Sequence, residues 1–388
     1  MMRPMKLAGS ELLFGKGSLE YLEKLNAKKA VLVLAGDFLY STGIMDIVHK
    51  HLDNAGIAYV PYVGIEPDPY FSTVIKGAEF MLEHNPDIII AIGGGSAMDA
   101  AKAMWIYYEH PEIESLDYIT VKENFPKLRN KARFCCIPTT AGTASEVSRS
   151  IVITDDETHI KYGIGNMEMM PDIAICDPVT TLSLPNHITA ETGMDALCHA
   201  LEALASTRAN YLSDILAEAS ALDIFNYLPK VINDPKNIDY REKMINAAMV
   251  AGLAFTNVSL GITHSIAHGL GSLFNMPHGL ANAILLPYIV AFNSLNIDAK
   301  AIYDNFASKL NEADLSKALF ALNEKVNIPS KLSERITDEE KFLSKLDTLI
   351  EFAIKDGCTK TNPILPTKTN LKNIILAAYY GKEVPKQL

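Results

Sequence analysis

Short apolar runs alternate with amphipathic segments in the first half of the chain. Runs of strand length and mostly apolar composition occupy residues 29–35, 58–63 and 87–92. Apolar positions at helical spacing follow them at residues 44–55, 74–84 and 97–108. Apolar strands separated by helices are typical of a parallel sheet covered on both faces. We therefore predict α/β structure with a parallel sheet in this part of the chain.

The pattern changes near residue 185, where long amphipathic stretches take over and strand-like runs become few. The helical stretches occupy residues 190–205, 211–228, 241–257 and 260–274. A chain of 388 residues is also too long for a single core, so two domains are expected. We predict an α/β domain at residues 1–184 and an all-helical domain at residues 185–388.

Composition narrows the possible classes of protein. No window approaches the roughly 18 apolar residues of a membrane helix, and no signal-peptide core follows the basic N-terminus. We therefore expect a cytoplasmic protein without a membrane partner. The net charge is −11 without a Lys/Arg cluster, which disfavours nucleic acid as a partner. The five cysteines form no CxxC pair, so buried thiols are favoured over a disulfide framework or a structural zinc site.

A glycine-rich turn stands between the apolar run at 87–92 and the next helix. We call its residues 93–96, with the sequence GGGS, the glycine loop. Glycines let the backbone approach phosphates closely, and a helix N-terminus favours negative charge. The loop does not match GxGxxG, so a pyrophosphate cradle and a plain tight turn are both open. Asp99, one turn later, could bond the loop backbone or complement the helix dipole.

A second loop rich in hydroxyl groups follows the apolar run at 134–137. We call residues 138–146, with the sequence PTTAGTASE, the hydroxyl loop. Threonine hydroxyls and a glycine suit contacts with phosphate or nicotinamide. The alternative interpretation is a Ser/Thr-rich helix N-cap with Glu146 in the first turn.

Metal-competent side chains recur at helical spacing in the second half. His264 and His268 stand four positions apart, as do Asp195 and His199, so each pair shares one helix face. His278 follows shortly after. Polar side chains on apolar helix faces are costly unless they are paired or bind a metal. A carboxylate with imidazoles suits Fe²⁺, Zn²⁺, Mn²⁺ or Co²⁺. We favour a metal site on two helices over hydrogen-bonded core histidines.

Together these motifs resemble the iron-containing (group III) alcohol dehydrogenase family. The resemblance rests on GGGSAMDAAK (93–102), PTTAGTASEVS (138–148), GMDALCHALEA (193–203), residues 251–287 and CTKTNP (358–363). It covers essentially the whole chain. It is strongest to the lactaldehyde/1,3-propanediol dehydrogenases and to the alcohol dehydrogenase half of bifunctional aldehyde–alcohol dehydrogenases. The resemblance implies a dehydroquinate synthase-like fold, with an N-terminal dinucleotide-binding domain and a helical metal-binding domain.

The resemblance also implies the site residues. The divalent metal, usually iron with zinc as an alternative, would be bound by Asp195, His199, His264 and His278. His268 would lie near nicotinamide and substrate, and we predict that it relays the proton. The implied cofactor-binding residues are Asp68, Gly94, Gly95, Ser96, Asp99, Thr139, Thr140, Thr143, Lys161, Thr180 and Leu182.

One position departs from the family pattern. The aspartate that usually follows the first strand and binds the ribose 2′-hydroxyl is replaced here by Gly36, and Asp37 comes next. A carboxylate at this place repels a 2′-phosphate, whereas a glycine admits it. We favour NAD, with Asp37 taking over the role, and keep NADP as the alternative.

The implied activity is hydride transfer between NAD(P)(H) and a short primary alcohol or aldehyde, through a metal-bound alkoxide. One alternative is a glycerol dehydrogenase-like zinc enzyme of the same fold, which uses an aspartate and two histidines. The presence of His199 four residues after Asp195 favours the alcohol dehydrogenase. Another alternative is a non-enzymatic nucleotide- or metal-binding scaffold. The segment 5–14 could pair between subunits, which predicts a homodimer or a higher homo-oligomer.

Overall fold

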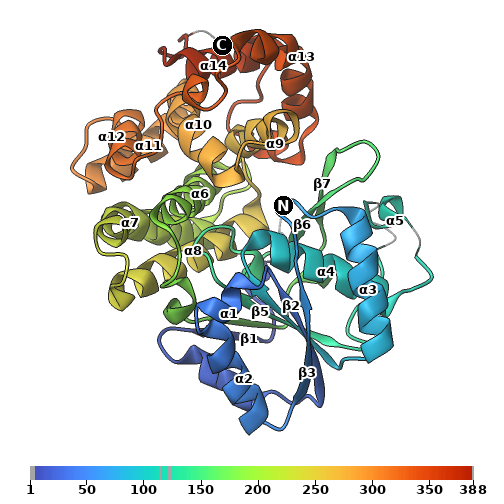
Figure 1. Cartoon of the computed structure of the whole chain (residues 1–388). Helices are drawn as coiled ribbons and strands as arrows, with labels where there is room; N and C mark the ends of the chain where they lie inside the picture. The colour runs from blue at the N-terminus through green and yellow to red at the C-terminus, as the bar shows by residue number, and fades with distance from the viewer. Residues whose placement is uncertain (1–4, 114, 121–124, 387–388) are drawn as a thin grey trace. The chain divides into compact units, whose positions relative to one another are not determined.

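The computed structural model describes residues 5–113, 115–120 and 125–386 (Figure 1). The chain divides into two compact units. The first unit contains Met1–Leu184 and Lys236–Thr256, and the second contains Pro185–Pro235 and Asn257–Leu388. The sequence pattern predicts a single boundary at 184/185, but helix α8 (Ile238–Val258) returns almost entirely to the first unit. Its Gly252 packs so closely on Ala144 that a Cβ there would lie 2.4 Å from the alanine Cβ.

A six-stranded parallel sheet forms the centre of the first unit, with strand order β1-β8-β5-β4-β2-β3. Its strands are β1 (Glu11–Phe14), β2 (Lys29–Leu34), β3 (Ala58–Val63), β4 (Ile88–Gly93), β5 (Arg133–Pro138) and β8 (Ile173–Cys176). A separate antiparallel hairpin joins β6 (Ser150–Thr154) to β7 (Lys161–Gly165). The parallel sheet predicted from the sequence is confirmed.

Helices cover both faces of this sheet, because alternate strand residues point to opposite sides. Val31 and Val33 of β2 pack with helices α3 (Phe71–His84) and α4 (Gly95–Glu109). Leu32 and Leu34 of the same strand pack with the opposite layer. That layer contains the 3₁₀ helix η1 (Ser18–Lys24) and helices α1 (Phe38–Ser41) and α2 (Ile44–Asn54). The remaining short elements of the unit are α5 (Leu116–Thr120), η3 (Ser145–Val147), η4 (Met167–Met169) and η5 (Pro178–Thr181).

The N-terminal segment contributes an edge strand to the chain's own sheet. Residues 11–14 form β1, which pairs with β8 of the chain's own sheet and lies at its edge. A strand at a sheet edge keeps one row of backbone groups available for another chain. Pairing of this segment between subunits therefore stays a prediction.

The described part of the second unit contains helices and no strand, as the sequence predicts. Its α-helices are α6 (Asn186–Ala205), α7 (Tyr211–Asn233), α9 (Ile262–Phe274), α10 (His278–Asn293), α11 (Ile297–Lys309), α12 (Leu315–Lys325), α13 (Glu339–Lys355) and α14 (Lys368–Tyr380). The 3₁₀ helix η6 (Leu332–Glu334) lies between α12 and α13, and the 3₁₀ helix η7 (Gly357–Thr361) lies between α13 and α14. Helix α6 lies against α7 and α10 and is buried along almost its whole length, which places its polar side chains inside the unit.

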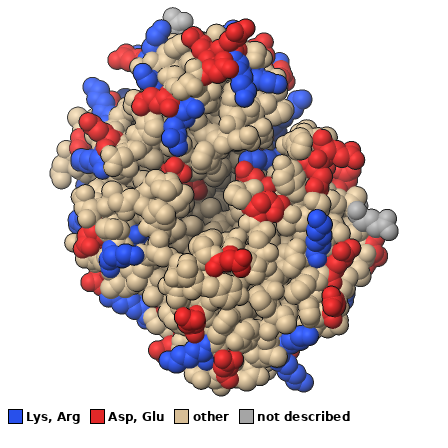
Figure 2. All heavy atoms as spheres, viewed as in Figure 1, with Lys and Arg blue, Asp and Glu red and all other residues tan. Residues whose placement is uncertain are grey.

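On the face shown in Figure 2, Lys and Arg are interspersed with Asp and Glu and form no basic patch. Within the described ranges, no helix taken singly has the length and apolar character to cross a membrane, although α8 and α9 together meet those two criteria as a bent pair. All five cysteines are free thiols, and four of them are buried.

Candidate metal centre and nucleotide loops

Three helices of the second unit bring four metal-competent side chains together. Asp195 and His199 lie one turn apart on α6, with exposed fractions of 1% and 4%. His264 lies in the first turn of α9, and His278 is the first residue of α10. The sequence pattern predicts two helices, but the chain turns at Asn275, whose φ is 53°, and starts a new helix after Pro277. We call Asp195, His199, His264 and His278 the ligand cluster.

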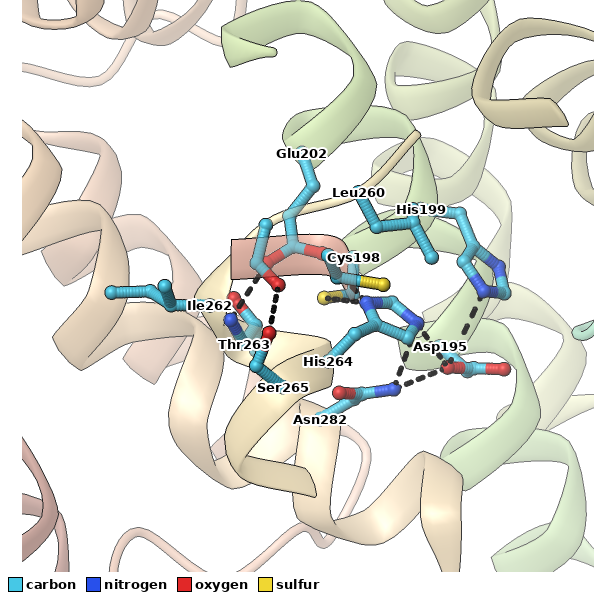
Figure 3. A network of polar contacts seen from close by, with 12 residues as sticks. Asp195, Cys198, His199, Glu202, Leu260, Ile262, Thr263, His264, Ser265 and Asn282 are labelled. Atoms are coloured by element: carbon cyan, nitrogen blue, oxygen red, sulfur yellow. Dashed lines mark hydrogen bonds and ion pairs between the residues drawn. The ribbon is translucent and has the colours of Figure 1, made fainter. Parts of the chain in front are cut away.

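The ligand cluster converges on one carboxylate oxygen, and Figure 3 shows His199 and His264 directed at Asp195. Oδ1 of Asp195 lies 3.9 Å from Nε2 of His199 and 3.6 Å from Nε2 of His264. Nε2 of His278 also lies 3.6 Å from this oxygen. One potential ligand atom from each of Asp195, His199 and His264 falls within 4.8 Å of the other two. Lewis-basic atoms gathered this closely in a buried place suit a divalent cation.

The electrostatics of the cluster keep its carboxylate ionised. Burial by itself raises the pKa of Asp195, but the neighbouring imidazoles of His199, His278 and His264 outweigh burial and hold this pKa well below its usual range. A permanently negative oxygen among imidazole nitrogens is the donor set that Fe²⁺ or Zn²⁺ accepts. The residues present therefore fit such an ion.

A buried carboxylate supports the cluster from behind. Nδ1 of His264 lies 2.6 Å from Oε2 of Glu202, and Oε1 of Glu202 accepts a 2.8 Å hydrogen bond from the backbone N–H of Thr263. A carboxylate at Nδ1 places the imidazole proton there and leaves the Nε2 lone pair directed at Asp195. Cys198 Sγ lies 3.7 Å from the same Nδ1, so this thiol faces the back of His264. Cys198, Glu202 and His264 therefore form a second buried group of metal-competent atoms, on the Nδ1 side of His264.

Asn282 is a site residue that the sequence analysis missed. Its Nδ2 lies 2.7 Å from Oδ1 of Asp195 and 3.1 Å from Nε2 of both His264 and His278. The side chain is fully buried, and its Oδ1 has no hydrogen-bond partner within the described part of the chain. An amide nitrogen carries two hydrogens, so three acceptors aimed at it exceed what it can satisfy. The available signal was the spacing, because Asn282 follows His278 by four residues on α10.

Replacing Asn282 by Leu is expected to weaken Zn²⁺ or Co²⁺ binding by about 10- to 100-fold, because Asp195 loses the donor that orients it. The measurement is a competitive chelator titration of the purified variant. Asn323→Leu is the matched control: Asn323 is also buried and donates to the carbonyl of Ala283, away from the cluster. Equal metal affinities in wild type and Asn282→Leu would contradict an orienting role.

His268 lies beside the ligand cluster without joining it. Its side chain is 27% exposed, and its Nδ1 lies 2.8 Å from Oδ2 of Asp356. Its ring stacks on His278 with centroids 5.4 Å apart. The structure thus places His268 next to His278 of the ligand cluster, and Asp356 contacts its Nδ1 and not its Nε2.

The glycine loop and the hydroxyl loop lie against each other in the first unit, because they follow the neighbouring strands β4 and β5. Thr139 N–H donates a 2.9 Å hydrogen bond to the carbonyl of Gly93. A Cβ on Gly95 would lie 2.8 Å from Cγ2 of Thr143, and one on Gly94 would lie 3.3 Å from Cγ2 of Thr140. Gly95 is therefore required for close packing of the two loops. Gly94 is the N-cap of α4, so the backbone N–H groups at this helix start, including that of Ser96, suit a phosphate.

The hydroxyl loop leads into a short 3₁₀ helix with Glu146 in its first turn and not into an α-helix, and its N-cap residue makes no side-chain hydrogen bond. Ala144 has a φ of 52°, and residues 145–147 form the single 3₁₀ turn η3. Strand β6 follows directly. Burial raises the pKa of Glu146 to about 7, because its carboxyl lies inside the unit and not in an exposed first turn.

Asp99 of α4 is engaged by the protein itself. Its Oδ1 accepts from Ser145 Oγ at 2.7 Å, and its Oδ2 accepts from Val152 N–H at 2.9 Å. Lys102, one turn later and fully buried, donates to the carbonyls of Ser145 and Ser148 at 2.7 and 2.8 Å. Asp99 and Lys102 thus attach the hydroxyl loop and β6 to α4. Asp99 was expected from the resemblance to be a cofactor-binding residue, whereas no sequence pattern pointed to Lys102.

The other predicted cofactor residues also belong to the first unit. Asp68 has a φ of 53° and pairs through Oδ2 with Lys161 Nζ at 2.7 Å. Its backbone N–H lies 3.4 Å from Ser96 Oγ, which connects the pair to the glycine loop. Thr180 is buried, and its hydroxyl donates within the unit, to the carbonyls of Pro138 and Asp177. The carbonyl of Leu182 accepts a hydrogen bond from Lys236 Nζ at 2.9 Å. The Thr180 hydroxyl and the Leu182 carbonyl are therefore both engaged by the protein itself.

Asp37 occupies the N-cap of α1, just beyond the end of β2. Its side chain is exposed and makes no capping hydrogen bond. Gly36 precedes it with its Cα beside the exposed ring of Phe38, where an added Cβ would meet ring carbons at 3.1 and 3.2 Å. Because Phe38 is on the surface, its ring is able to give way to a larger residue at position 36.

Comparison with known proteins gives consistent results for both units. Residues 9–178 match the family model of the iron-containing alcohol dehydrogenases, and residues 189–379 match the model of the C-terminal part of the Fe-containing alcohol dehydrogenase family. The NADPH-dependent butanol dehydrogenase of Clostridium saccharobutylicum is 45% identical, over 96% of this chain and 97% of that protein. The aldehyde-alcohol dehydrogenase of Streptococcus pneumoniae is 36% identical over 99% of this chain, which corresponds to 47% of that longer protein.

Solved structures give the same result. The iron-containing alcohol dehydrogenase of Thermococcus thioreducens superimposes with a TM-score of 0.90 at 29% identity, covering 98% of this chain and all of that one. A 1,3-propanediol oxidoreductase superimposes with a TM-score of 0.88 at 31% identity, over 97% of this chain and 100% of that one.

Proposed function

Because this chain belongs to the iron-containing alcohol dehydrogenase family and is a metal-dependent, NAD(P)-linked oxidoreductase of alcohols and aldehydes, we propose that it binds Fe²⁺ at the ligand cluster and interconverts short primary alcohols and aldehydes with NADP(H). The observation that carries the proposal is the convergence of three buried or half-buried imidazoles on the ionised carboxylate of Asp195. A cation bound there supplies Lewis acidity, which polarises an aldehyde carbonyl and lowers the pKa of an alcohol.

The protein's own residues supply position and proton transfer. Glu202 holds the His264 ring with its Nε2 toward Asp195, and Asn282 orients the Asp195 carboxylate. His268 offers its Nε2 as the proton acceptor in alcohol oxidation and as the donor in aldehyde reduction. The backbone of the glycine loop binds the pyrophosphate, and the packed hydroxyl loop keeps that backbone in place.

Preference for NADP(H) is supported by two observations. The region that follows β2 carries Gly36 in place of a carboxylate, and Asp37, the next residue, is exposed at the start of α1. A relative with 45% identity is named an NADPH-dependent enzyme. On these grounds we propose NADP(H) as the preferred cofactor, in place of the NAD that we favoured from the sequence with Asp37 as the ribose-binding acid.

Gly36→Asp is expected to lower the ratio of kcat/KM for NADPH to that for NADH by at least about 10-fold, mainly through the KM for NADPH. A carboxylate at this position repels the 2′-phosphate. Two negative charges placed side by side make the binding free energy less favourable by more than about 1.4 kcal/mol, which corresponds to a tenfold loss of affinity. Steady-state kinetics with both cofactors measures it. Asp37→Asn is the control, and it should change the ratio little. A wild type that prefers NADH, and loses that preference in Asp37→Asn, would restore the role first given to Asp37.

The activity itself is tested anaerobically with metal-stripped protein reconstituted with Fe²⁺ or Zn²⁺. Oxidation of NADPH with propanal or butanal, restored most strongly by Fe²⁺, is the expected result. Glycerol oxidation that Zn²⁺ restores in place of aldehyde reduction would favour the glycerol dehydrogenase-like alternative. Absence of turnover with every aldehyde, metal and cofactor would favour a non-enzymatic scaffold.

We further propose a homodimer, which the exposed edge of β1 supports, and a cytoplasmic location. Light scattering coupled to size-exclusion chromatography tests the first, and cell fractionation tests the second. A monomer at micromolar concentration would remove the proposed role of β1.

A further inference from the structure

Both histidines of α9 have a carboxylate at Nδ1. His264 has Oε2 of Glu202 at 2.6 Å, and His268 has Oδ2 of Asp356 at 2.8 Å. The two acids come from different elements, since Glu202 belongs to α6 and Asp356 lies between α13 and η7. Glu202 contacts His264, a member of the ligand cluster, whereas Asp356 contacts His268, which lies outside the cluster. No sequence motif pointed to Asp356.

Asp356 is held in place independently of His268. Its backbone N–H donates to the carbonyl of Phe352 at the end of α13, at 3.0 Å. Its Oδ1 accepts from Cys358 N–H at 2.7 Å, which caps η7, and lies 3.3 Å from Ser265 Oγ. One carboxylate oxygen is thus engaged by the fold, and the other is directed at the imidazole.

This arrangement determines where His268 carries its proton. An ionised carboxylate only accepts hydrogen bonds, so the neutral ring facing Oδ2 must have its hydrogen on Nδ1. The hydrogen bond of Asp356 to His268 helps to hold the pKa of this carboxyl below its usual range, although burial opposes it. The Nε2 lone pair is then available, and stacking on His278 fixes the plane of the ring beside the ligand cluster.

We propose that Asp356 is a positioning residue that fixes His268 in the Nδ1–H form, with Nε2 as the group that exchanges a proton with the substrate oxygen. In alcohol oxidation, the O–H bond breaks, the proton forms an N–H bond with Nε2, and the hydride passes from carbon to NADP⁺. Aldehyde reduction reverses both transfers. The inference rests on the proposed role of His268 as the proton relay.

Asp356→Asn tests this inference with almost no change of volume. The asparagine carbonyl oxygen is able to replace Oδ1 as the acceptor for Cys358 N–H, but its amide nitrogen then faces Nδ1 as a donor and favours the opposite tautomer. A corresponding aspartate-to-asparagine change in a Ser-His-Asp triad lowers kcat by about 10⁴-fold. We expect kcat to fall by about 100-fold or more in this protein, with metal content, melting temperature and KM for NADPH close to wild type.

Two control variants separate this role from structural damage. Asp338→Asn makes the same change at the N-cap of α13, where Asp338 accepts from Lys341 N–H and contacts no histidine, and it should leave kcat unchanged. Asp356→Glu should recover part of the activity, because it restores an acceptor. In Zn²⁺-loaded protein with ¹⁵N-labelled histidine, the His268 resonances, identified by their absence in His268→Ala, should show Nδ1–H in wild type and Nε2–H in Asp356→Asn.

The double variant distinguishes failure of this inference from failure of the proposed function. If His268 relays the proton, His268→Ala loses activity, and Asp356→Asn has little further effect in that background. Full activity in His268→Ala would overturn the relay itself. A large loss in His268→Ala with normal kcat and an unchanged tautomer in Asp356→Asn would overturn only the role of Asp356. Loss of bound metal or a lowered melting temperature in Asp356→Asn would show a structural role and also overturn it.

Discussion

Asp195→Ala is expected to abolish metal binding and turnover while the second unit stays folded. Asp195 is the carboxylate on which three imidazole nitrogens converge, and its single negative charge would offset part of the charge of a divalent ion. Removing an outer-shell partner already costs about 10- to 100-fold in metal affinity, so loss of this ligand should exceed the upper end of that range. The fold should tolerate the change, because alanine is a strong helix former in the middle of α6.

The measurement is metal content by mass spectrometry after dialysis against a weak chelator, together with circular dichroism and aldehyde reduction. His264→Ala is the companion variant and should behave alike. Glu191→Gln is the matched control, since Glu191 is a buried acid one turn earlier on α6 and is not a member of the ligand cluster. Stoichiometric metal and normal turnover in both Asp195→Ala and His264→Ala would overturn the assignment of the ligands.

Lys102→Met should destabilise the first unit strongly, by about 3–5 kcal/mol in the free energy of unfolding. The ammonium group is fully buried and donates to three backbone carbonyls, those of Ser145, Ser148 and Ser150. Burial lowers the pKa of Lys102 and raises that of Asp99, and the attraction between the two groups opposes both shifts. Methionine fills the space but leaves the Asp99 carboxyl without its counter-charge.

Urea unfolding followed by fluorescence of the single tryptophan measures this loss, because Trp105 lies on the same helix α4. Lys76→Met on α3 is the control, as Lys76 is exposed and should change stability by less than about 0.5 kcal/mol. Adding Asp99→Asn to Lys102→Met should restore part of the stability by removing the unpaired charge. An unfolding midpoint like that of wild type in Lys102→Met would exclude the structural role of this lysine.

Hydrophobic periodicity predicts the central strands and fails at the short ones. β2 and β4 are buried on both faces and therefore appear as continuous apolar runs. β1 has four residues with an intermediate and exposed pattern, and the β6–β7 hairpin lies outside the main sheet, so neither carries a strong signal. Their positions depend on tertiary pairing, which local pattern does not encode.

The candidate metal site also combines features that are readable from the sequence with features that depend on tertiary packing. Spacing of four residues joins Asp195 to His199 within one helix, and this was readable from the chain. The distances that bring α6, α9 and α10 together depend on how the helices pack. Asn282 and Asp356 were therefore missed, although they lie closer to the functional side chains than some residues that were predicted. Their residue types are common, and only the tertiary packing brings them against Asp195 and His268.

The return of Lys236–Thr256 to the first unit has a consequence for how the protein is made. A ribosome that has synthesised the chain as far as Leu184 has completed every strand of the sheet, yet the helix that packs Gly252 onto Ala144 has still to emerge. The nascent nucleotide-binding half must therefore wait through the synthesis of α6 and α7 before its own core is complete. An expression fragment that stops at residue 184 would lack this helix, whereas one that appends residues 236–256 through a flexible linker would include every segment of the unit.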